Sequence, residues 1–131
     1  MSRLSTKQRR ARVKRRRHQR VLVVRDRLNA LGSRSKHYDE FGREIGFGDW
    51  AYLMEWGGFR RRRVASTYLP DQTWVSTVAL GIDQGIGNDR PVLFETMVFD
   101  KKGNDLDSMR WCTRGEAERG HRSMVEEWRK P

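Results

Sequence analysis

Two strand-length runs of β-branched and aromatic residues lie near the middle of the chain, at residues 74–82 and 91–99. Consecutive residues of a strand point to opposite faces of its sheet, so the side chains of Trp74 and Val75 lie on different faces. Apolar residues recur on both faces of both runs, which indicates that each face is at least partly covered. We therefore predict two neighbouring central strands of an antiparallel sheet.

The segment 83–90 joins these two runs and is too long for a two-residue turn. Its Gly85 and Gly87 suggest a phosphate-binding loop as one interpretation. However, their spacing matches neither the Walker nor the dinucleotide pattern, and no helix pattern follows. We interpret the segment as the loop of a hairpin.

The C-terminal segment has the most regular helical pattern. Thr113 and Glu116 have the spacing of a capping box, and we expect the helix to run to about Arg129. Gly120 permits a close approach to the sheet, and His121 is expected to be a hydrogen-bonded core residue rather than a ligand or a base. The apolar stripe consists of Ala117, His121, Met124, Val125 and Trp128.

The region before the central strands predicts smaller elements. Residues 38–45 have the pattern of a hairpin in which Asp39 opens the turn and Gly42 adopts a positive φ. Asp49 is then expected to cap a short helix over residues 50–56, which two glycines close.

An arginine-rich stretch at residues 59–68 is predicted to be a further strand. Alternation places Arg60 and Arg62 on one face and the two neighbouring arginines on the other. At least one of these pairs must be exposed, because burying an unpaired guanidinium is prohibitive. The arginines either protect an edge strand from aggregation or provide a second contact for phosphates. A last strand is expected over residues 107–112.

Together these elements predict an α+β fold. It consists of an antiparallel sheet of four to five strands with the C-terminal helix packed on one face, a shorter helix near residues 49–56 and a basic N-terminal helical arm. We expect residues 1–32 to form the arginine-rich helix or arm, and residues 33–131 to form a single small α+β domain.

The net charge of +11 is confined to the start of the chain. Residues 1–27 contain twelve Lys or Arg and one acidic residue, whereas the other residues contain sixteen of each sign. Residues 6–31 include neither Pro nor Gly, so they can form one helix, capped by Ser5 or Thr6 and ended by Gly32.

Such an arginine-rich segment is typical of nucleic-acid binding, because its cations neutralise phosphates and release counterions. Residues 7–20 have almost no apolar face, so they form either a solvated helical extension or a disordered arm that orders on a polyanion. Alternatives are a solubilising tail and attachment to anionic lipid, although no aromatic or long apolar face accompanies the charges. The residues predicted to bind nucleic acid are Arg9, Arg10, Arg12, Lys14, Arg15, Arg16, Arg17, Arg20, Arg60, Arg61, Arg62 and Arg63.

Other kinds of site have little support. No His, Cys or carboxylate residues have metal-ligand spacing, and no serine or cysteine has the context of a nucleophile elbow. We therefore predict no metal, no cofactor and no catalytic residues. The single cysteine, Cys112, excludes an intramolecular disulfide and suits a reducing compartment. No apolar run approaches membrane-spanning length, so we expect no membrane partner.

Two blocks of the sequence are similar to a known group. Residues 75–83 (VSTVALGID) with 93–99 (LFETMVF), and residues 110–121 (RWCTRGEAERGH), resemble small uncharacterised proteins encoded by bacteriophages, especially those that infect actinobacteria. The resemblance covers roughly residues 38–128. In that group a histidine often follows the aspartate equivalent to Asp83, where this chain has glutamine. The resemblance implies a location in the host cytoplasm, brings no established activity, and does not include the arginine-rich arm.

Three functional hypotheses follow. The first is a non-enzymatic phage accessory protein that binds DNA or RNA through the arginine-rich arm. The alternative is a protein–protein interaction module that docks on a host or virion protein, with the arm contacting an acidic partner. The third is an enzyme that uses Asp83, Glu95 and His121, which requires Glu95 and His121 to line one cleft.

Overall fold

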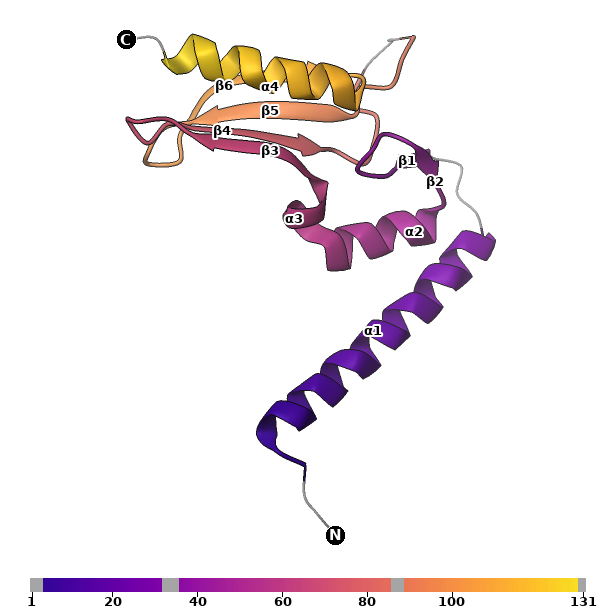
Figure 1. Cartoon of the computed structure of the whole chain (residues 1–131). Coiled ribbons are helices and arrows are strands. Elements are labelled where there is room, and N and C mark those ends of the chain that lie inside the picture. The colour runs from indigo at the N-terminus through magenta and orange to yellow at the C-terminus, as the bar shows by residue number, and fades with distance from the viewer. Residues whose placement is uncertain (1–3, 32–35, 86–88, 130–131) are drawn as a thin grey trace.

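The structure is a computed structural model that describes residues 4–31, 36–85 and 89–129. Its main feature is an antiparallel sheet in the order β3-β4-β5-β6, with helix α4 packed across one face (Figure 1). The chain therefore has the predicted α+β fold, with four strands in this sheet. The strands are β3 (Arg63–Tyr68), β4 (Trp74–Ala79), β5 (Phe94–Phe99) and β6 (Asp105–Trp111), and α4 spans Arg114–Arg129.

The two apolar runs form the central pair β4 and β5, as predicted. The two strands pair over their whole length, from Trp74 opposite Phe99 to Ala79 opposite Phe94. Both strands are shorter than predicted. β4 ends at Ala79, and Gly81 just beyond it has a φ of 81°, which is not an extended conformation. Backbone pairing nevertheless continues one step further, where the Leu80 amide donates to the Leu93 carbonyl at 2.8 Å.

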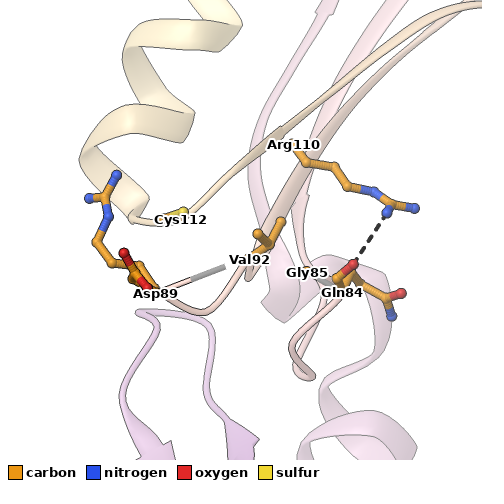
Figure 2. A pocket seen from close by; sticks show the side chains of 7 residues that line it. Gln84, Gly85, Asp89, Val92, Arg110 and Cys112 are labelled. Atoms are coloured by element: carbon orange, nitrogen blue, oxygen red, sulfur yellow. Dashed lines mark hydrogen bonds between the residues drawn. The ribbon is translucent and has the colours of Figure 1, made fainter. Parts of the chain in front are cut away.

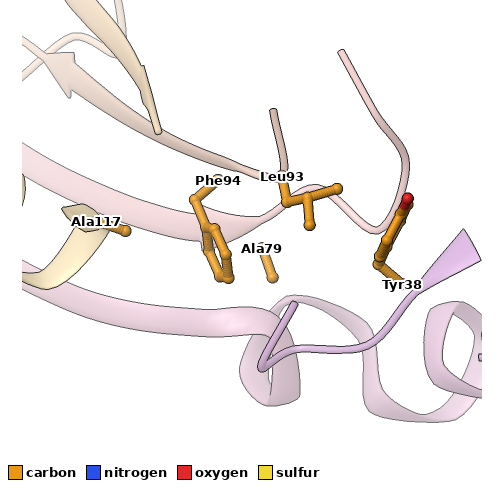
Figure 3. Close-up of a cluster of buried hydrophobic side chains, with 5 residues drawn as sticks. All are labelled: Tyr38, Ala79, Leu93, Phe94 and Ala117. Atoms are coloured by element: carbon orange, nitrogen blue, oxygen red, sulfur yellow. The ribbon is translucent and has the colours of Figure 1, made fainter. Parts of the chain in front are cut away.

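The core lies between α4 and the sheet, in two adjoining clusters. The first consists of Tyr38, Ala79, Leu93, Phe94 and Ala117 (Figure 3). The second consists of Leu69, Val75, Val98, Met124 and Val125. Trp111 of β6 packs against both clusters and so joins them into one core.

Helix α4 begins with the predicted capping box in a modified form. The Thr113 hydroxyl accepts a hydrogen bond from the Glu116 amide at 3.1 Å and donates one to the Glu116 carboxylate at 3.2 Å. The Glu116 carboxylate therefore accepts from the Thr113 hydroxyl, whereas in a standard capping box it would accept from the Thr113 backbone amide. Gly120 lies directly against the Trp111 ring, and a Cβ atom there would overlap the ring. The predicted close approach and the predicted apolar stripe are both confirmed.

The predicted small hairpin is also confirmed. β1 (His37–Tyr38) and β2 (Glu44–Ile45) pair antiparallel. Asp39 Oδ1 accepts hydrogen bonds from two turn amides at 2.9 Å, and Gly42 has a φ of 83°. The hairpin contributes Tyr38 to the core.

The segment after this hairpin differs from the prediction. It is helical throughout, as α2 (Phe47–Tyr52), a π-helical segment η1 (Leu53–Gly57) and α3 (Gly58–Arg62). Gly46 occupies the N-cap position of α2, so the prediction that Asp49 caps the helix is wrong. The predicted strand over residues 59–68 is wrong in its first half, because the strand begins only at Arg63.

Two features of the sequence explain these errors. A pair of glycines usually ends a helix, but here Gly58, with a φ of 52° and a ψ of −156°, only redirects the chain. The arginine run has no apolar period that distinguishes a helix from a strand. Since arginine has a high helix propensity, residues up to Arg62 continue as a helix.

Helix α1 spans Thr6–Leu31. It begins with a reciprocal cap, in which the Gln8 amide donates to Ser5 Oγ at 3.2 Å and the Ser5 amide donates to Gln8 Oε1 at 2.8 Å. Its last turns lie beside α2, and its first turns lie away from the sheet (Figure 1). Gly32, the predicted helix stop, lies outside the described residues. The division of the chain into an arm and a domain stays a prediction.

Candidate nucleic-acid interface

The first half of α1 presents basic side chains to solvent. No acidic residue occurs from Thr6 to Arg25, so this part of the helix has no carboxylate of its own to neutralise its cations. The positive end of the helix dipole lies at the same end. The exposed basic residues are Lys7, Arg9, Arg10, Arg12, Lys14, Arg15, Arg16 and Arg17. The side chain of Arg20 lies outside the described residues.

The four arginines after Gly58 lie on α3 and at the start of β3. They do not alternate across a sheet as predicted, because three of them belong to the helix. Arg60 and Arg63 have exposed side chains. Arg61 Nε lies 3.4 Å from Glu40 Oε1, so this guanidinium already has a carboxylate partner.

Arg62 is the half-buried member of this group. Its guanidinium lies over the Phe59 ring, 4.8 Å from the ring centroid, and its Nη1 donates to the Ala79 carbonyl at 3.3 Å. Burial lowers the pKa of Arg62. These contacts fix the Arg62 side chain beside the sheet, so only part of it remains available to a ligand.

The face of the sheet opposite α4 has a row of three aromatic rings, one from each of three neighbouring strands. Tyr68 of β3 lies opposite Trp74 of β4, which lies opposite Phe99 of β5. The Tyr68 and Trp74 rings are nearly parallel, with centroids 5.6 Å apart, and the Trp74 and Phe99 centroids are 5.3 Å apart. The Trp74 indole also donates to Ser66 Oγ at 2.8 Å, which orients its ring. We call these three residues the aromatic row.

The surface is hollowed on both sides of the aromatic row. One cavity of about 480 Å³ is lined mainly by apolar side chains of β4 and β5, and also by Phe59, Arg62 and Arg63. A second cavity of about 470 Å³ lies toward the β5–β6 turn, where Asp100 and Lys101 both line it. Both cavities have aromatic walls, and the first also has two arginines among its lining residues.

Glu95 lies on the same face and lines the first cavity. Its Oε2 accepts a hydrogen bond from Arg110 Nε at 2.9 Å, across the β5–β6 pair. The Glu95 carboxylate is therefore already paired with an arginine.

His121 lies on the other face, between α4 and the sheet. Its Nδ1 is hydrogen-bonded to Thr77 Oγ1 at 2.8 Å and its Nε2 to Thr67 Oγ1 at 2.9 Å. Thr77 is also bonded to Thr96 Oγ1, which accepts from Trp111 Nε1 at 3.0 Å. Burial, with a further contribution from the nearby positive charge of Arg122, lowers the pKa of His121. The histidine is a hydrogen-bonded core residue, as predicted.

The three residues of the enzyme hypothesis do not meet. Glu95 and His121 lie on opposite faces of the sheet. Asp83 lies in the loop after β4, where its Oδ1 accepts from the amides of Gly85 and Val92 at 2.8 and 2.9 Å. These hydrogen bonds lower the pKa of Asp83 and bind the two ends of the loop together. This set of residues therefore cannot act on one substrate.

A third cavity, of about 630 Å³, lies where this loop meets β6 and the start of α4 (Figure 2). Gln84, Val92 and Cys112 are among its lining residues. Its two arginines are both engaged, since Arg90 lies 3.0 Å from Glu116 and Arg110 is bound to Glu95. The cavity thus offers an anion little uncompensated positive charge. Residues 86–88, which include Gly87 of the phosphate-loop interpretation, lie outside the described residues.

The aromatic row was absent from the site residues predicted from the sequence. Alternation assigns Trp74 and Phe99 each to a face, but only the pairing register shows that both belong to the same face. Tyr68 was expected in a strand, yet nothing in the pattern indicates that it lies opposite Trp74. The one available signal was the aromatic residue at an end of each strand.

Among the residues that the structure describes, no group of three or more His, Cys, Asp or Glu side chains is placed to hold a metal ion. In the same part of the chain, no helix combines the length and the apolar character needed to cross a membrane. Comparisons with protein-family models, with curated proteins and with solved structures gave no match.

Proposed function

We propose that the protein binds nucleic acid, and that the basic first half of α1 neutralises phosphates of the backbone. One observation carries the proposal. The whole net charge of +11 resides in residues 1–27, and the basic side chains of α1 up to Arg17 are exposed. A concentrated array of cations gains free energy from a polyanion because binding releases condensed counterions. An equal charge dispersed over the surface lacks this advantage.

The chemistry of these side chains defines the mode of binding. A guanidinium presents a planar fork of donors that matches two phosphate oxygens. Phosphates are the same in every sequence, so such contacts give affinity with little sequence preference, on DNA or RNA. Arg60 and Arg63, which are exposed, supply a second set of contacts. This role involves no bond-breaking step, and it fits a phage accessory protein in the host cytoplasm.

The proposal is tested by removing charge from the helix without removing the helix. Glutamine has a helix propensity close to that of arginine, so a variant with Arg9, Arg10, Arg16 and Arg17 all changed to Gln retains α1. Its matched control changes four exposed basic residues of the body, away from the aromatic row, to Gln, namely Lys102, Arg119, Arg122 and Arg129. Affinity for fluorescent DNA and RNA probes is measured by anisotropy over a range of salt concentrations.

We expect the helix variant to bind more weakly and to depend less on salt. The slope of log K against log salt should decrease by about three if all four arginines contact phosphates. The control should retain most of the wild-type affinity and slope. Equal losses in the two variants would show that only overall charge matters, and no binding of any probe by the wild-type protein at low salt would exclude the proposal.

The alternative function, docking on a host or virion protein, is favoured by a different observation. Phe59 and Tyr68 expose 66% and 69% of their surface, and exposed aromatic residues are common in protein interfaces. Docking through apolar contacts would change little with salt, whereas phosphate binding weakens steeply. The salt series therefore separates the two functions.

A further inference from the structure

We infer that the face of the sheet opposite α4, which we call the open face, binds the bases of a single-stranded segment of nucleic acid through the aromatic row at one end of its strands. This inference rests on the proposed function and specifies the form of nucleic acid that the protein prefers. Base faces stack on aromatic side chains, and this contact tolerates any sequence. In a duplex the base faces are already stacked on one another, so only unpaired bases can use such a surface.

The aromatic row has the accessibility that stacking requires. Tyr68 is the last residue of β3, which is an edge strand of the sheet. Its side chain is 69% exposed, while Trp74 and Phe99 are half-buried. Cavities lie on both sides of the row. A base therefore has room against the rings without displacing a side chain of the core.

The charged and apolar side chains around the aromatic row indicate where the bases and the phosphates of a bound strand would lie. The cavity next to Phe59 is lined mainly by apolar side chains, and its one carboxylate, Glu95, repels phosphate although Arg110 pairs with it. Arg62 and Arg63 are the cationic residues that line this cavity, and Arg63 is exposed, whereas Lys101 of the second cavity has Asp100 beside it. Phosphates are therefore expected near Arg63 and bases over the apolar side chains.

The same distribution favours nucleic acid over a protein as the occupant. An apolar protein segment would cover the apolar side chains but would leave the charge of Arg63 without a counterpart. A single strand matches both parts, because it has an apolar, stackable face on each base and a negative charge on each phosphate. The basic part of α1 in the same chain is complementary to the same polymer.

The test uses full-length protein and two labelled probes, a single-stranded oligothymidylate of about 12 nucleotides and a duplex of similar length. The variant is Tyr68→Leu, which retains an apolar side chain at an exposed position and removes the ring. Phe41→Leu is the matched control, because Phe41 is 51% exposed but lies on the turn of the β1–β2 hairpin, away from this face. Anisotropy is recorded at low and at moderate salt, and thermal unfolding verifies that each variant is folded.

Tyr68→Leu should raise the Kd for the single strand at least about fivefold, since stacking on one ring contributes that much or more. The Kd for the duplex should change by less than about twofold, and the control should change neither. The slope of log K against log salt should stay at the wild-type value, because stacking involves no counterion. In this respect the variant differs from the α1 variant described above.

Two outcomes would overturn the inference in distinguishable ways. If the wild-type protein binds both probes and Tyr68→Leu weakens neither, or weakens both equally, the open face does not bind single strands and the role of α1 is unaffected. A protein-docking face would give the first of these results. If the wild-type protein binds neither probe, the proposed function is overturned together with the inference.

Discussion

The two faces of the sheet differ in what covers them. Under α4, the side chains are sealed from water; Val75, Thr77, Phe94, Thr96 and Val98 are all 0% exposed. On the opposite face, Ser76 is buried, the half-buried residues include Trp74, Val78, Met97 and Phe99, and Tyr68 is largely exposed. Apolar burial stabilises in proportion to the area removed from water. The α4 face therefore provides most of the stability, while the open face keeps aromatic surface accessible.

This difference shows that composition alone does not separate a buried face of a sheet from an accessible one. Both faces carry apolar and aromatic side chains at alternate positions of the same strands. What distinguishes them is the covering helix and the pairing register, which brings Tyr68, Trp74 and Phe99 side by side. Substitutions on the α4 face should therefore lower the stability more than matched substitutions on the open face.

The largest effect is expected for Phe94→Ala. Phe94 is fully buried between α4 and the sheet, so removing its ring should lower the free energy of unfolding by about 3–5 kcal/mol. Phe99→Ala at the other end of β5 removes the same ring from the open face and should cost clearly less. Urea unfolding of both variants measures the difference. Equal losses would show that the open face contributes as much to stability as the core.

A smaller effect is expected where α4 meets the sheet most closely. In Gly120→Ala the new methyl group overlaps the Trp111 ring, so the helix or the ring must move. Overpacking of this kind should cost about 1–3 kcal/mol. Gly115→Ala is the matched control in the same helix, because its methyl group meets only the mobile end of Arg119. Thermal unfolding should show a lower Tm for Gly120→Ala and an unchanged or slightly higher Tm for Gly115→Ala.

The smallest effect is expected from pH, through His121. Its pKa in the folded protein is below the ordinary value of about 6.5, so the unfolded chain takes up the proton first. The free energy of unfolding should be constant above that pH and should fall as the pH decreases below it, until the lower folded-state pKa is reached. Urea midpoints recorded across this range measure the dependence.

The His121→Gln variant isolates this contribution from that of the other histidines. Glutamine retains a donor and an acceptor for the two threonines but does not titrate. Its stability should be lower overall and should vary less with pH than that of the wild-type protein. An unchanged pH dependence in this variant would mean that a group other than His121 causes it.

Much of the fold was predictable because strong local signals agree with the tertiary structure. The alternation around Val75 and Phe94 identified the central strands, and the spacing of Thr113 and Glu116 identified the start of α4. The helical path through α2, η1 and α3 was not predictable in the same way. A π-helical segment is rare, and neither glycines nor arginines carry a period that reveals one.

One part of the candidate site was likewise predictable from the sequence, and the other part was not. The basic residues of α1 are visible in the sequence because charge is a local property. The aromatic row depends on the register of three strands, and the lengths of two connections determine that register. Arg62 illustrates the same limit, since its position over Phe59 follows from a helix that the sequence did not indicate.

The hydrogen-bonded groups around His121 restrict how this sequence can change over evolution. The chain of bonds from Trp111 through Thr96 and Thr77 to His121 and Thr67 includes one residue from each strand of the sheet and one from α4. Replacing one member with an apolar residue leaves its neighbour unpaired, at a cost of about 1–3 kcal/mol, whereas replacing both partners of a bond together can be nearly neutral. An apolar core at these positions is therefore separated from the present one by less stable intermediates. Substitutions here should persist only when they occur as a set.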